Sequence, residues 1–95
     1  MRRGYVYLMA SKRNGTLYIG VTNNLIERVT QHKEGRGSVF VKKYGVTMLV
    51  WYEERPLLTD AIQRETSLKR WPRKWKIALI EKVNPDWRDL YFELF

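Results

Sequence analysis

The first part of the chain shows the residue pattern of a β-hairpin. Residues 5–10 and 17–21 are rich in aromatic and β-branched side chains, which favour strands. The turn dipeptide Asn14-Gly15 lies between them, so the two segments are expected to pair as antiparallel strands. The connecting loop is basic.

An amphipathic helix is predicted directly after the hairpin. Residues 22–24 offer Thr and Asn side chains, which favour helix N-caps. Leu25, Val29 and His32 then follow at helical spacing, up to Gly35. This spacing places the three side chains on one face of the helix.

The middle of the chain carries a third predicted strand. Residues 46–53 are rich in β-branched and aromatic side chains, and Pro56 closes the segment. The preceding residues 35–45 contain three glycines and several cations. They form either a basic loop or a short helix, and the pattern leaves both open.

Two further helices are predicted in the second half. Thr59 and Asp60 are N-cap candidates for a helix that runs toward Trp71, and Pro72 interrupts it. Because proline suits the first helical turn, Pro72 is expected to open a third helix, which ends near Asn84. The aromatic tail is expected to pack back on the domain as a short helix.

The elements combine into an α+β fold. Their order, ββαβαα, predicts a small three-stranded antiparallel sheet flanked by helices. At 95 residues, the chain is expected to be one domain, residues 1–95, with a single core. The absence of cysteine excludes disulfides and thiol nucleophiles. No apolar run approaches the ~18 to 20 residues of a membrane span, so a cytoplasmic location is expected.

Positive charge is concentrated in the first half of the chain. The formal net charge is +8, and residues 1–45 hold nine basic and two acidic residues. This excess favours a polyanionic partner, because binding to phosphates releases counterions; a solubilising surface is the alternative. The residues expected to contact nucleic acid are Lys12, Arg13, Arg36, Lys42, Lys43, Lys69, Arg70, Arg73 and Lys74.

Several polar side chains are suited to binding and cleaving a phosphodiester. Arg28 and His32 are four residues apart and share a face of the first helix. Glu65 lies on the apolar stripe of the second helix, where a charge without a partner is costly. Magnesium is a suitable partner, because it commonly binds through one or two carboxylates, water and substrate phosphate. With an arginine on the phosphate and a tyrosine or histidine near water, hydrolysis becomes feasible.

Two tyrosine motifs make this pattern specific. The triplets YVY at 5–7 and YIG at 18–20 are followed in order by Arg28, His32 and Glu65. In these features the chain resembles the GIY-YIG endonuclease superfamily, and in particular its small stand-alone bacterial members. The resemblance covers nearly the whole chain. It implies metal-dependent hydrolysis of DNA phosphodiester bonds.

The resemblance implies that three rings handle the attacking water. Tyr7 matches the tyrosine of the first motif, Tyr18 matches that of the second, and His32 falls where family members carry histidine or tyrosine. Tyr18, or Tyr7 acting with His32, would position or deprotonate the water. A tyrosine with an ordinary pKa of about 10 would need a neighbouring cation to act as a base near neutral pH.

The remaining matches imply phosphate and metal binding. Arg28 matches the arginine that holds the scissile phosphate. Glu65 matches the single glutamate that binds the divalent ion, Mg²⁺ or Mn²⁺. Gly20 completes the second motif as a structural residue.

Three features depart from the family pattern. The first motif lacks its glycine. Val21 stands where several family nucleases carry a lysine, which removes a phosphate contact or a charge that would lower a tyrosine pKa. The late asparagine of the family has only Asn84 as a candidate, far along the chain from Glu65.

Each residue also has a structural interpretation. Tyr7 and Tyr18 are typical of half-buried strand aromatics, and His32 of a core or surface histidine. Arg28 could pair with the nearby acids Glu27 or Glu34. The carboxylate at position 65 could pair with the lysine four residues on, which is worth only ~0.3 to 0.5 kcal/mol.

The favoured hypothesis is a structure-selective DNA endonuclease with a role in repair or recombination, associated with the nucleoid when bound to DNA. The alternative is a noncatalytic nucleic-acid-binding module with the same fold, and an adaptor for other proteins is a third. RNA stays open as a substrate, and a protein partner is not indicated.

Overall fold

A three-stranded antiparallel sheet forms the centre of the structure, a computed structural model that describes residues 2–95. Its strands are β1 (Gly4–Ala10), β2 (Leu17–Thr22) and β3 (Met48–Arg55). β1 lies between the other two, so that β2 and β3 are the edges of the sheet. The predicted hairpin is therefore confirmed, and the third strand begins two residues later than the pattern indicated.

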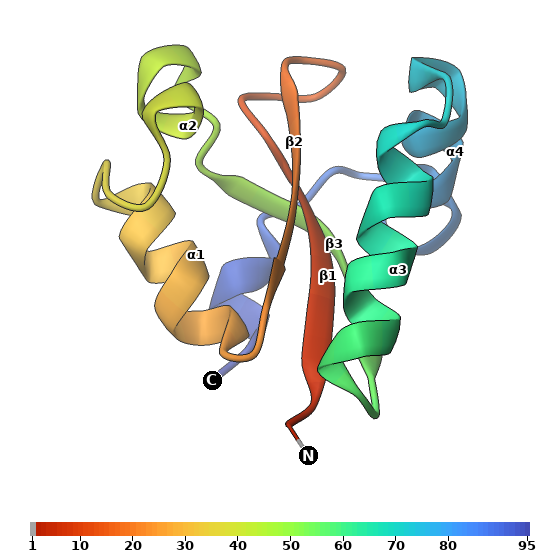
Figure 1. Cartoon of the computed structure of the whole chain (residues 1–95). Coiled ribbons are helices and arrows are strands. Elements are labelled where there is room, and N and C mark those ends of the chain that lie inside the picture. Colours follow the sequence, from red (N-terminus) through yellow and green to blue (C-terminus); the bar gives the residue numbers. More distant parts are fainter. Residues whose placement is uncertain (1) are drawn as a thin grey trace.

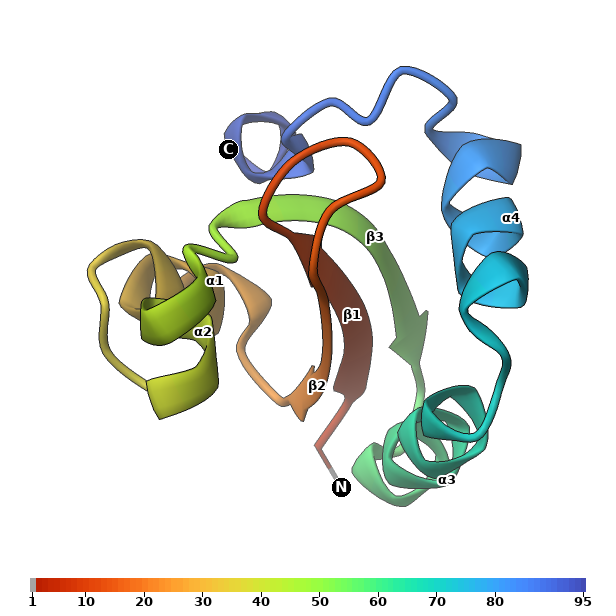
Figure 2. The same ribbon diagram turned by 90° about the horizontal axis from the view of Figure 1, so that it is seen from above.

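Helices flank both faces of the sheet (Figure 1). α1 (Leu25–Lys33) and α2 (Val39–Tyr44) lie on one side, whereas α3 (Leu58–Lys69) and α4 (Arg73–Val83) lie on the other (Figure 2). The aromatic tail returns to β3 through a short 3-10 helix, η1 (Leu90–Glu93), as expected. The predicted α+β class is confirmed. Among residues 2–95, no helix is long and apolar enough to cross a membrane.

Alternation along β1 gives the sheet an apolar cluster on each face. Val6 and Leu8 belong to the cluster that includes residues of α3 and α4, whereas Tyr7 and Met9 belong to the cluster that includes residues of α1 and α2. All four side chains are buried. The expected single core is thus divided by the sheet, because successive side chains of a strand point to opposite faces.

The basic segment that precedes β3 contains a helix. The Ser38 hydroxyl accepts a hydrogen bond from the Val41 N–H at 3.2 Å and caps the start of α2. Val41 is the one buried residue of this six-residue helix, so the segment is too short to show a helical period of buried positions. The element order is ββααβαα, with one helix more than the predicted ββαβαα.

The predicted caps of α3 are wrong. Thr59 and Asp60 lie inside the first turn, and the helix begins at Leu58. The Leu58 N–H donates to the Arg2 carbonyl at 2.9 Å. Because this long-range bond satisfies one of the free N–H groups at the helix start, it takes the place of a side-chain cap.

The starts of β1 and α3 touch closely. A Cβ at Gly4 would lie 2.6 Å from the Ala61 Cβ and 2.9 Å from the Leu58 Cα. The missing side chain of Gly4 therefore allows the helix to pack directly on the strand. This contact fixes α3 relative to the sheet.

Candidate active site

A tyrosine ring lies against a glycine on the neighbouring strand. Tyr7 of β1 is paired with Gly20 of β2, and both residues are buried. A Cβ at position 20 would lie 2.8 Å from Cε1 of Tyr7, and closer still to Cζ and the hydroxyl oxygen. Glycine is therefore required for the ring to lie here. The glycine of the YIG triplet thus leaves room for the tyrosine of the first motif.

Three rings from three elements meet at this point. The Tyr7 hydroxyl is hydrogen-bonded to Nε2 of His32 on α1 at 2.9 Å. The Tyr18 ring of β2 lies with its centroid 5.4 Å from that of His32 and 6.4 Å from that of Tyr7. The helical spacing of His32 had placed it on the apolar face of α1, and it is buried there. The structure therefore brings the three predicted residues together.

Burial sets the protonation of the hydrogen-bonded pair. Burial raises the pKa of Tyr7 well above its usual range; charge on Tyr18 and Glu65 raises it further, and the Arg28 charge opposes this. The pKa of His32 is lowered, first by burial and then by Arg28, and the Arg36 backbone partly offsets this. Tyr7 is therefore a protonated phenol and His32 a neutral imidazole near pH 7.

The two tyrosines differ in their access to solvent. Tyr7 is only 1% exposed, whereas Tyr18 is half-buried on the edge strand. Water reaches the second phenol more readily than the first. This difference was not visible in the sequence, where both residues had the same strand environment.

Arg28 lies one helical turn before His32 and has no acidic partner within residues 2–95. Glu34 pairs instead with Arg36, and Glu27 accepts a side-chain hydrogen bond from Asn24. The alternative in which Arg28 pairs with a nearby surface acid is therefore not observed. Its guanidinium remains available for an anion.

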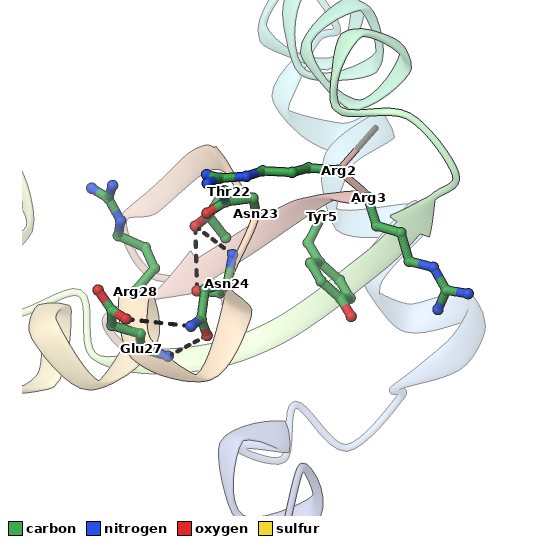
Figure 3. Close-up of a pocket in the computed structure, with 8 residues that line it drawn as sticks. All are labelled: Arg2, Arg3, Tyr5, Thr22, Asn23, Asn24, Glu27 and Arg28. Carbon is green, nitrogen blue, oxygen red and sulfur yellow. Dashed lines mark hydrogen bonds between the residues drawn. The ribbon is translucent and has the colours of Figure 1, made fainter.

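A basic hollow of about 620 Å³ opens beside Arg28. Figure 3 shows Arg2 extending toward Thr22 and Arg28 rising from α1, whereas Arg3 points the other way. Arg3 pairs with Glu54 at 2.7 Å. Sequence reasoning missed Arg2, although two adjacent arginines ahead of the first strand were a usable signal.

Glu65 is on α3, which packs against β1 and β2 from the opposite side. Its side chain is 15% exposed, and its carboxylate lies 3.6 Å from Nζ of Lys69. The alternative i to i+4 pairing is thus present, at a distance longer than a hydrogen bond. Glu65 also raises the pKa of Tyr7, so its field reaches the cluster of rings.

The carboxylate of Glu65 fits a metal that takes few protein ligands. Within the described part of the chain, no three His, Cys, Asp or Glu side chains are grouped to hold a metal. A cage made only of side chains is therefore absent from residues 2–95. A magnesium site with one carboxylate, water and substrate phosphate is compatible with Glu65.

A second hollow, of about 360 Å³, lies at the free edge of β2. It is lined by Tyr18 and its strand neighbours, by Phe40 of α2, and by Lys69 and Lys76. Elements from both sides of the sheet thus meet over the edge strand. Sequence reasoning missed Phe40. The positive charge of Lys76 was visible in the sequence, but only tertiary packing shows that it lies beside Tyr18.

The other predicted nucleic-acid contacts differ in how free their charges are. Arg73 donates to the carbonyls of Asn14 and Gly15 at 2.7 and 2.6 Å, and so ties the hairpin loop to α4. Arg36 is paired with Glu34. Lys69 is exposed and lies beside the Glu65 carboxylate. The remaining predicted contacts are exposed on the hairpin loop, on α2 and around the start of α4: Lys12, Arg13, Lys42, Lys43, Arg70 and Lys74.

Asn84, the candidate for the late asparagine, has a structural position. It is fully buried, and its amide donates to the carbonyls of Val50 at 3.0 Å and Arg88 at 2.9 Å. Its side-chain oxygen accepts from the Arg88 N–H. These bonds join the end of α4 to β3.

Residues 3–78 match the model of the GIY-YIG catalytic domain. The chain belongs to the GIY-YIG family. This match spans both tyrosine motifs, Arg28, His32 and Glu65, whereas Asn84 lies beyond it.

Small bacterial relatives share most of their length with this chain. The UPF0213 protein SH2523 of Staphylococcus haemolyticus is 33% identical over 82 residues, which are 86% of this chain and 99% of that protein. The UPF0213 protein CPE1444 of Clostridium perfringens is 36% identical over 76 residues, 80% of this chain and 81% of that protein.

A solved structure confirms the GIY-YIG-like fold. The solution NMR structure of the UPF0213 protein BH0048 from Bacillus halodurans superposes with a TM-score of 0.57 and covers 92% of both chains. Its sequence identity to this chain is 24%, so the likeness concerns the fold.

Substituting Gly20 by alanine is expected to destabilise the protein by about 1 to 3 kcal/mol, because the new Cβ overlaps the buried Tyr7 ring. The loss should be much smaller in a Tyr7→Ala background, where the ring is gone. Chemical denaturation of the four proteins in this cycle measures the coupling. Equal costs in both backgrounds would contradict the steric account.

Stability is also expected to fall as the pH drops below about 6.5, the ordinary pKa of His32. The pKa of the folded state is lowered, so the unfolded chain takes up a proton first and stabilisation by the neutral ring is lost. This loss should continue until the pH reaches the folded-state pKa. Denaturation at several pH values, compared with His32→Gln, measures it; an unchanged slope in the variant would contradict the assignment.

Proposed function

We propose that this protein is a metal-dependent endonuclease that hydrolyses DNA phosphodiester bonds. The family supports this reaction class. The observation that carries the proposal is the buried Tyr7–His32 hydrogen bond. The charges of Arg28 and Glu65 shift the pKa of its phenol in opposite directions. A passive DNA-binding surface needs cations, and has no evident use for a buried phenol–imidazole pair under these two charges.

We assign the water-positioning role to Tyr18. Its phenol lies beside the Tyr7–His32 pair and lines the hollow at the edge of β2. Tyr7 is buried and retains its proton, so we assign it to holding the His32 ring in place. His32 in turn borders the Tyr18 ring. The hydrogen-bonded pair is thus a support for Tyr18.

We assign Arg28 to the nonbridging oxygens of the scissile phosphate. Its lack of an acidic partner within residues 2–95 and the basic hollow beside it support this role. A guanidinium binds phosphate oxygens in a bidentate geometry, which orients the phosphorus for attack.

We assign Glu65 to binding Mg²⁺ or Mn²⁺. When bound, such an ion stabilises negative charge that develops on the phosphate. Lys69 and Lys76 supply positive charge beside Tyr18.

A substrate selected by shape fits the size of the domain. Few surface elements are available to read a long base sequence, and the exposed cations are spread over the hairpin loop, α2 and the start of α4. Branched or flapped DNA of the kind met in repair and recombination is the proposed substrate class.

Glu65→Ala is expected to abolish cleavage and to keep DNA affinity within about threefold, because it removes the metal ligand and no phosphate contact. Labelled duplex, single-stranded, flapped and four-way-junction DNA would be incubated with magnesium or manganese, and with chelator. Glu93→Ala, on η1, is the matched control and should cut as the native protein does. Metal-dependent cutting by Glu65→Ala would contradict the assignment, and binding without any cutting by the native protein would favour the noncatalytic module.

Arg28→Ala is expected to lower kcat by about 100- to 1000-fold, as the loss of one charge-stabilising donor does in other enzymes. The melting temperature should change little, because Arg28 has no ion pair in the described structure. Cleavage rates and thermal melts of Arg28→Ala and Arg28→Lys, with Arg88→Ala as control, measure both effects. A large fall in melting temperature would instead mark Arg28 as structural.

A further inference from the structure

A row of aromatic rings leads from the candidate site to the surface. The Phe40 ring of α2 has its centroid 6.1 Å from that of Tyr18, and the Tyr44 ring lies 4.8 Å from that of Phe40. Phe40 and Tyr44 are 41% and 48% exposed. The roles proposed above use neither residue, and adjoining exposed apolar side chains can mark an interaction site.

The surroundings of these rings are positively charged. Lys42 and Lys43 lie on the same six-residue helix, which has no acidic residue, and Nζ of Lys43 lies 5.4 Å from the centre of the Tyr44 ring. Lys69 and Lys76 face Phe40 across the hollow at the edge of β2. A purely apolar partner would leave the charges of Lys42, Lys43 and Lys76 without a negative counterpart.

A nucleotide matches both properties at once. Its base offers a flat apolar face, and its phosphate is negative. Single-stranded nucleic acids bind proteins by stacking bases on aromatic side chains within a basic groove. In a duplex the faces of the bases are covered by their neighbours, so this surface suits an unpaired or extruded base.

We propose that Phe40, with Tyr44 behind it, stacks on an unpaired base next to the phosphate that is cut. This inference rests on the proposed nuclease function, which places the scissile phosphate between Arg28 and Tyr18. Because Phe40 and Tyr18 line the same hollow, the stacked base is within one or two nucleotides of the cleavage point. The substrate is then DNA with a single-stranded segment at the cut, such as a flap.

The test measures binding apart from cleavage. Single-stranded DNA that carries one 2-aminopurine is titrated with the protein in chelator, where a stacked 2-aminopurine loses fluorescence. Phe40→Ala should bind about 5- to 150-fold more weakly, the range for loss of one base–aromatic stack, and should lose the quenching at one position. Phe40→Tyr should retain both. Phe92→Ala, an exposed aromatic on η1 at the opposite edge of the sheet, is the matched control.

Several results would overturn the proposal. Unchanged affinity and quenching in Phe40→Ala would do so, as would no binding of single-stranded DNA by the native protein. A change in oligomeric state in Phe40→Ala would assign the rings to a second copy of the chain. Because Phe40 is partly exposed, Phe40→Ala should keep the melting temperature of the native protein. Measuring the melting temperature of each variant therefore excludes unfolding as the cause of weaker binding.

Failure of this inference is distinguishable from failure of the nuclease function. If the native protein cuts flapped DNA and Phe40→Ala binds and cuts it equally well, the stacking fails and the nuclease stands. If base quenching depends on Phe40 but no metal-dependent cutting occurs, the stacking surface is supported and the enzyme assignment fails.

Discussion

The close contact between the Tyr7 ring and Gly20 determines how the candidate site is assembled. Because Gly20 has no side chain, the Tyr7 ring places its hydroxyl directly over the neighbouring strand, where it meets Nε2 of His32. This bond joins α1 to the sheet through a buried polar pair. Arg28 comes one turn earlier on the same helix, so its position follows from that of His32. A glycine with no catalytic group thus orients two functional side chains.

The sheet also separates two opposite charges. α1 carries Arg28 on one side and α3 carries Glu65 on the other, and both charges shift the pKa of the buried Tyr7 phenol. α3 is held close because Gly4 leaves room for its first turns. Since β2 is an edge strand, side chains from both layers meet around Tyr18 without a further strand between them. An open edge is accessible to a polymer substrate in a way that an enclosed pocket is not.

The sequence predicted those parts of the fold that depend on local patterns. The hairpin followed from strand-forming residues around a turn dipeptide, and the start of α1 from residues 22–24, of which Asn24 caps the helix. The predicted start of α3 was wrong, because a backbone hydrogen bond from Leu58 to Arg2, which is distant in the sequence, fixes where the helix begins. α2 stayed undecided because its one buried residue gives no period.

In the candidate site, too, the sequence predicted some features and only tertiary packing revealed the others. The motif order identified Tyr7, Tyr18, Arg28, His32 and Glu65, and the structure gathers the three rings within reach of both charges. The different burial of Tyr7 and Tyr18 could not be read from the sequence, since both tyrosines lie in strand-forming segments. Phe40 and Lys76 come from elements that are remote along the chain, so packing alone shows that both lie beside Tyr18.

The most direct measurement is the location of the metal. The amide signals of isotope-labelled protein would be recorded while Mn²⁺ is added, with a flapped DNA whose linkages resist hydrolysis. The account predicts that paramagnetic broadening begins at Glu65 of α3 and at Tyr18 of β2, and that Glu65→Ala abolishes it. Broadening centred elsewhere, such as at the acidic residues Asp86 and Asp89, would contradict a phosphodiesterase site at the edge of β2.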